Sequence, residues 1–131
     1  MPELAMEIIL ARQFASTLNM PVFLVDPAGN LLFFNEPAEP ILGKRFEEIG
    51  EMPAAEWSTV FTPLDLDGAP LSPEALPLMI TLTEHRPAHR TFSIVGLDHV
   101  QRKVDVTSFP VIGVGDRVLG AVAIFWEVRP T

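Results

Sequence analysis

The chain has 131 residues, 48% of them hydrophobic and 20% charged, which is the composition of one globular domain with a sizeable core and not of a disordered chain. Its net charge of −8 disfavours nucleic-acid binding, because the nine Lys and Arg residues are scattered and form no basic stripe. The absence of cysteine excludes disulfides, zinc–thiolate sites and thiol nucleophiles.

The N-terminal residues and the apolar runs bear on localisation. No apolar run approaches the roughly 20 residues that span a bilayer, so we expect no membrane insertion. The N-terminal residues lack the basic start of a signal peptide. We therefore expect a soluble, cytoplasmic protein.

Residues 3–18 have helical periodicity and predict an N-terminal amphipathic helix. One face carries most of the apolar residues, with Leu10 at its border: Leu4, Ile8, Ala11, Phe14, Ala15 and Leu18. Met6 and Ile9 point elsewhere. Either the helix packs only on its own domain and its apolar pattern is irregular, or it is buried on two sides. In the second case one side packs against the domain and the other against another subunit. For the second interpretation, the expected dimer interface consists of Ile9, Leu10, Phe14 and Leu18.

Two short apolar runs at 22–25 and 31–34 predict strands joined by the turn sequence DPAGN. Asn35 is a plausible N-cap of a helix that the following prolines keep short and that Gly43 ends. Residues 44–62 predict one or two single-turn helices around Trp57 and Phe61.

Ser72 precedes Pro73 and Glu74 and predicts the start of a longer helix. From residue 88 the apolar period changes to two, which predicts strands. Residues 118–128 are almost entirely apolar, the pattern of a central strand. We expect three long strands, joined by hairpins, to end the chain.

This order of elements resembles that of a PAS domain. The segment VDPAGNLLFFNEPAEPILG is similar to the opening of the family, with Asp26 and Gly29 in the first hairpin and Asn35 before the first helix. The segment LDLDGAPLSPEALPLMITL is similar to the loop and helix of many bacterial PAS domains. VDVTSFPVIGVGDRVLGAVAIFWEV is similar to the last two strands, with Pro110 after the fourth strand and Gly120 in the fifth.

The resemblance covers roughly residues 20–128 and implies an α+β fold. We expect a five-stranded antiparallel sheet with short helices over one face, formed by a PAS domain at 20–131 and flanked by the helix at 1–19. It further implies a sensory or interaction module of a bacterial two-component or related system, and we expect it to pair as a homodimer, as PAS domains commonly do. The output kinase, cyclase or regulator domain is not in this chain, and residues 127–129 depart from the Asp-(Ile/Val)-Thr ending common in the family.

In this family a ligand pocket lies between the sheet and the helices. The residues that the strand parity and the helices direct toward it are Trp57, Phe61, Leu78, Leu82, Phe92, Ile94, Val104, Val106 and Ser108. The alternative is that these residues simply fill the core, since pockets and cores use the same residue types. A ligand-free dimerisation scaffold is therefore the competing function.

No obligatory cofactor is expected. Flavin–cysteine photochemistry, known in one branch of the family, is excluded because the chain has no cysteine. His85 is the one candidate haem ligand, and no other metal site is expected. No residue is predicted to be catalytic, because the serines lack a nucleophile-elbow context. A small α+β-barrel enzyme is disfavoured, since the chain has no tyrosine and too few strands.

Overall fold

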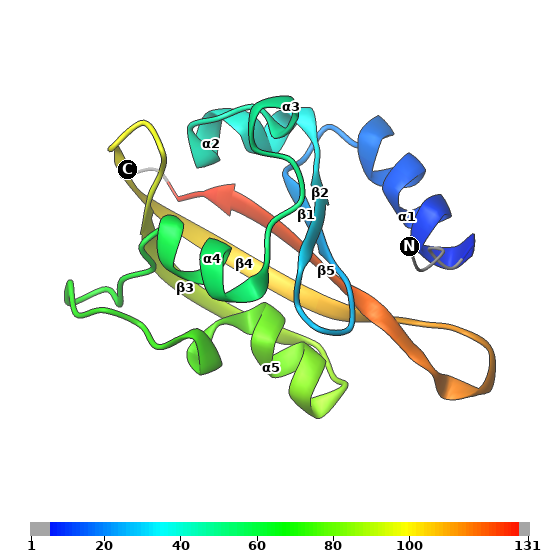
Figure 1. The fold of residues 1–131 in the computed structure, drawn as a ribbon. Helices are drawn as coiled ribbons and strands as arrows, with labels where there is room; N and C mark the ends of the chain where they lie inside the picture. Colours follow the sequence, from blue (N-terminus) through cyan, green and yellow to red (C-terminus); the bar gives the residue numbers. More distant parts are fainter. Residues whose placement is uncertain (1–5, 129–131) are drawn as a thin grey trace.

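The computed structural model describes residues 6–128 and contains one sheet and several short helices over this range (Figure 1). The elements are α1 (Met6–Thr17), β1 (Val22–Val25), β2 (Leu31–Phe34), α2 (Glu39–Leu42), α3 (Phe46–Ile49), α4 (Ala54–Val60), α5 (Pro77–Glu84), β3 (Ala88–Val95), β4 (Gln101–Ile112) and β5 (Val118–Glu127). Single 3-10 turns occur at Glu36–Ala38, Pro73–Ala75 and Val114–Asp116.

The strands form a five-stranded sheet in the order β2-β1-β5-β4-β3, in which every neighbouring pair is antiparallel. The nearly all-apolar β5 lies in the centre, between β1 and β4, as its composition predicts. The last three strands are joined by hairpins. The expected α+β architecture, with short helices over one face of an antiparallel sheet, is therefore confirmed.

The sheet separates two apolar clusters, because alternate residues of each strand face opposite sides. Its inner face packs against α2, α4 and α5 and carries Phe92, Ile94, Val104 and Val106, all buried as the period of two predicts. Its outer face carries Leu24 and other residues that pack against α1. Figure 1 shows α4 in front of the sheet, α5 along its lower edge and α1 at the upper right.

Helix α1 lies on the outer face through Ile8 and Ala15, which are both buried. Gly120 permits this close packing: a Cβ there would lie 2.3 Å from the Val25 carbonyl oxygen and 3.2 Å from Ile8 Cδ1, and its φ of +150° disfavours a side chain. Phe14, which the helical spacing grouped with Ile8 and Ala15 on one face, does not share their packed face, because it is 65% exposed. It points away from the domain, since apolar residues occupy both sides of this helix.

The side chain of Asn35 joins α1 to the sheet. Asn35 stands at the predicted N-cap position, before the 3-10 turn at Glu36–Ala38, but its side chain makes no capping hydrogen bond. Its Oδ1 accepts a hydrogen bond from the Val22 amide at 2.9 Å. Its Nδ2 donates to the Ala15 carbonyl at 2.9 Å and to the Met20 carbonyl at 2.8 Å. Asn35 is 1% exposed, and its bonds to Val22 and Ala15 are buried, so water does not readily replace the side chain there.

The helix predicted from Ser72 begins later. Residues Pro73–Ala75 form a 3-10 turn, and α5 starts at Pro77, where the ring occupies the first helical position. Ser72 forms no side-chain cap for the 3-10 turn. The turn between β1 and β2 forms as predicted, because Asp26 Oδ1 accepts hydrogen bonds from the amides of Ala28 and Asn30.

Replacement of Asn35 by Ala is expected to lower the free energy of unfolding by about 2–4 kcal/mol, because it removes three hydrogen bonds, two of them buried. Urea denaturation measures the change. Asn19→Ala is the matched control: Asn19 is exposed, and its loss is expected to cost less than about 0.5 kcal/mol. Equal stabilities of the two variants would contradict this role of Asn35.

The strand parity is tested by an arginine on each face of β4. Val106→Arg places a charge in the apolar core and is expected to cost at least about 3 kcal/mol, or to prevent folding. Thr107→Arg places the same charge on the outer face, where Thr107 is half-buried, and is expected to be tolerated. Circular dichroism during thermal unfolding compares them. A stable Val106→Arg variant would show that the assigned parity is wrong.

Candidate functional site

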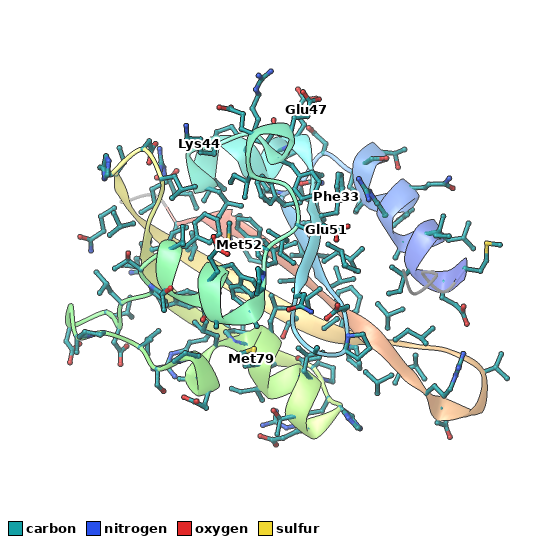
Figure 2. All side chains as sticks on the ribbon, viewed as in Figure 1. Phe33, Lys44, Glu47, Glu51, Met52 and Met79 are labelled. Carbon is teal, nitrogen blue, oxygen red and sulfur yellow. The ribbon has the colours of Figure 1, made fainter. Side chains whose placement is uncertain are left out.

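A cavity of about 80 Å³ lies in the core between the inner face of the sheet and α4 and α5. Side chains fill most of the space between these layers (Figure 2). The walls of the cavity are contributed by the sheet, by the helices and by the loops that join them, and consist of Phe23, Leu42, Trp57, Ser58, Phe61, Pro63, Leu76, Pro77, Leu78, Phe92, Ile94, Val104, Val106, Ala123 and Phe125.

Trp57 fixes α4 against the first hairpin at one wall. Its indole Nε1 donates a hydrogen bond to the Gly29 carbonyl at 2.7 Å, which satisfies the polar edge of an otherwise buried ring. Its ring meets Phe23 edge to face, with centroids 5.2 Å apart. Asn30 Oδ1 accepts from the Ala54 amide at 3.3 Å, so the hairpin also supports the first residue of α4.

A buried pair of hydroxyl groups links α5 to β4. The Oγ atoms of Thr81 and Ser108 are 2.6 Å apart and share a hydrogen bond, and both residues are fully buried. Ser108 therefore pairs with a helix and does not line the cavity, contrary to its predicted place there. Leu82, also predicted there, packs against the core cluster from outside the cavity.

The wall that α2 contributes is held by Arg102 of β4. Its Nη1 donates to the Ile41 carbonyl at 3.1 Å, next to the cavity residue Leu42. The same guanidinium forms hydrogen bonds to Asp98 at 3.1 and 2.7 Å, and its Nε lies 4.0 Å from the carboxylate of Glu127 at the end of β5. These hydrogen bonds lower the pKa of the Asp98 carboxyl from 3.8 to about 2.

Comparison by sequence finds no relative: no family model matches the chain, and no curated protein does either. Comparison by structure does. The PAS domain of a protein from Colwellia psychrerythraea matches with a TM-score of 0.65 at 13% identity, covering 92% of this chain and 97% of that one. The PAS domain of Bordetella pertussis BvgS matches with a TM-score of 0.64 at 13% identity, covering 95% and 87%.

A Rhodobacter sphaeroides LOV protein matches with a TM-score of 0.72 at 13% identity, covering 95% of this chain and 69% of that one. The chain has a PAS fold. The fold expected from the hairpin, the short helices and the last three strands is thereby confirmed.

Most of the predicted pocket residues surround the cavity: Trp57, Phe61, Leu78, Phe92, Ile94, Val104 and Val106. Sequence analysis missed Phe23 and Phe125, because β1 and β5 are almost entirely apolar and show no alternation that tells their two faces apart. It also missed Ser58, which followed Trp57 in the expected short helix but was considered only as a nucleophile. Whether these residues bind a ligand stays a prediction.

The cavity does not fit a haem or a flavin. Ligand pockets of drug-sized molecules usually measure roughly 300–1,000 Å³, far more than the space here. His85, the candidate haem ligand, is exposed at the C-cap of α5 and lies outside the cavity wall. Over residues 6–128, no cluster of three or more His, Asp or Glu side chains is placed to hold a metal ion.

Within the described part of the chain, no helix has the length and apolarity to cross a bilayer.

The Asp98–Arg102 contact predicts a pH dependence of stability. The folded-state pKa of Asp98 is depressed, so its stabilising contribution is complete above about pH 4 and is lost as the pH falls toward 2. Asp98→Asn is expected to be less stable than the parent at pH 7 and to lose less stability between pH 4 and 2. Urea midpoints at successive pH values measure both. In an Arg102→Gln background, Asp98→Asn should no longer alter the dependence of the urea midpoint on pH. An unaltered pH dependence in the parent background would contradict the stabilising role of the Asp98–Arg102 contact.

Proposed function

We propose that this PAS domain is a sensory module of a bacterial signalling system that binds a small molecule in its core cavity and acts as a homodimer. The observation that carries the proposal is the cavity itself, an apolar space enclosed by helices and the inner face of the sheet. A ligand bound there changes the relative populations of two conformations only by binding one of them better.

The strands β4 and β5 offer a route from the cavity to the outer surface. Ala123 and Phe125 line the cavity, whereas Ile124 and Trp126, which alternate with them, face outward. A shift of this backbone on ligand binding therefore alters both faces of the sheet. In this proposal, a cytoplasmic kinase, cyclase or regulator receives the change.

The outward side of α1 supports the homodimer. Met6, Leu10 and Phe14 follow one another at intervals of four residues and are all exposed, on the side of the helix opposite Ile8 and Ala15. Ile9 is exposed beside them, whereas Leu18 is half-buried. On the outer face of the sheet, Phe109 and Trp126 are exposed as well. A second copy of the chain would cover apolar groups that otherwise face water.

The small volume of the cavity favours one competing function, a ligand-free dimerisation scaffold. Native mass spectrometry with an absorption spectrum of the same sample distinguishes the two. We expect a colourless dimer that carries a small bound molecule, or that gains mass when one is supplied. A dimer that binds nothing supports the scaffold, and a monomer contradicts the homodimer.

Phe14→Asp is expected to shift the chain from dimer to monomer, because it places a charge in the proposed apolar interface. The fold should remain, since Phe14 is 65% exposed within the single chain. Light scattering over a range of concentrations gives the mass, and circular dichroism reports the fold.

The matched control is Leu66→Asp, an apolar-to-acidic change at a residue that is 57% exposed in the loop before α5. It adds the same charge and should leave the dimer intact. An unchanged dimer mass in the Phe14→Asp variant would exclude α1 from the interface.

A further inference from the structure

The walls of the cavity determine the charge of the molecule that it accepts. None of the side chains that line it is acidic or basic, and nearly all are hydrocarbon. The one tryptophan among them already uses its N–H in the bond to Gly29. A charged ligand would lose its hydration without gaining a counter-charge, so the cavity excludes carboxylates and amines.

Ser58 is the exception in this wall. It is 4% exposed, lies in α4, and its hydroxyl forms no hydrogen bond to any residue in the described range 6–128. Two other helical hydroxyls differ: Thr81 is paired with Ser108, and Thr59 donates to backbone carbonyls of its own helix. No side-chain oxygen or nitrogen of the described residues is both sealed from solvent and without a partner, so the Ser58 hydroxyl keeps a small accessible surface. A ligand oxygen in the cavity forms a hydrogen bond to this hydroxyl, which a hydrocarbon guest cannot do.

The volume limits the size of the molecule. An apolar cavity of roughly 150 Å³ takes up one benzene molecule, which has six non-hydrogen atoms. By the same ratio, a cavity of about 80 Å³ holds roughly three or four. A molecule of this size is too small to reach polar groups beyond the cavity wall.

We infer that the cavity binds a neutral molecule of roughly three or four non-hydrogen atoms, a short-chain alcohol, aldehyde or ketone, whose oxygen bonds to the Ser58 hydroxyl. This inference rests on the proposed function, because it gives the ligand class of the same cavity. The hydrocarbon part of the ligand contacts the aromatic and aliphatic wall, and Ser58 determines the preference for an oxygen-containing molecule.

The test uses three probes of similar small size in NMR titrations of the ¹⁵N-labelled chain: 2-propanol, acetate and xenon. Xenon reports whether an apolar guest enters the cavity, 2-propanol adds a hydroxyl, and acetate replaces it with a charge. We expect xenon and 2-propanol to shift the amide signals of cavity residues such as Phe92 and Val104, and acetate to leave them unchanged.

Two serine variants test the role of Ser58. Ser58→Ala is expected to weaken 2-propanol binding by roughly two- to tenfold and to leave xenon binding unchanged, because only the hydrogen bond is lost. Ser93→Ala is the matched control: Ser93 is also buried but lies outside the cavity wall, so its removal should affect neither probe.

The outcomes separate this inference from the proposed function. If xenon binds but 2-propanol does not, if acetate binds as tightly as 2-propanol, or if Ser58→Ala leaves 2-propanol binding unchanged, the ligand class is wrong while ligand sensing stands. If neither xenon nor 2-propanol binds, the cavity is closed to guests. The proposal of ligand sensing through this cavity then fails together with the inference.

Discussion

The carboxamide of Asn35 is the contact on which the arrangement of the domain depends. It stands directly after β2, and it bonds at once to the first residue of β1, to the Ala15 carbonyl in the last turn of α1 and to the Met20 carbonyl in the segment that follows the helix. Carbonyls in the last turn of a helix have no partner within the helix. Because one amide side chain supplies both a donor and an acceptor, it satisfies strand and helix together and fixes where α1 leaves the sheet. The position of the outer surface of α1 is therefore determined by Asn35, a residue outside that helix.

The inner side of the domain follows a different principle. Its polar side chains are kept away from the cavity by pairing with one another or with the backbone, as Thr81 pairs with Ser108 and Trp57 with Gly29. This pairing lets α4 and α5 pack on the sheet without leaving polar atoms in the space between them. What remains is an almost purely hydrocarbon wall in which a single hydroxyl, that of Ser58, stands out.

Periodicity was sufficient to predict the sheet. Alternation in β3 and β4 placed Phe92, Ile94, Val104 and Val106 on the buried face, and the apolar composition of β5 indicated its central position. The same rule placed Ser108 on the correct face, but it could not show that the hydroxyl of Thr81, which is distant in sequence, would form a hydrogen bond with that of Ser108. Helical periodicity failed for Phe14, because α1 carries apolar residues on both sides and the pattern does not say which side meets the sheet. The hydrogen bonds of Asn35 to α1 and β1 were not predictable, because the residues that follow it fit the start of a helix that Asn35 would cap.

The alternation along β5 has a thermodynamic consequence. Residues of one strand line the cavity and, one position further on, form the outer surface on which a second chain would rest. If occupancy of the cavity changes the affinity between two chains by some factor, then pairing of the chains must change the affinity for the guest by that same factor. The apparent affinity for the guest would then vary with protein concentration, so that the abundance of the protein itself would help to set the level of signal to which it responds.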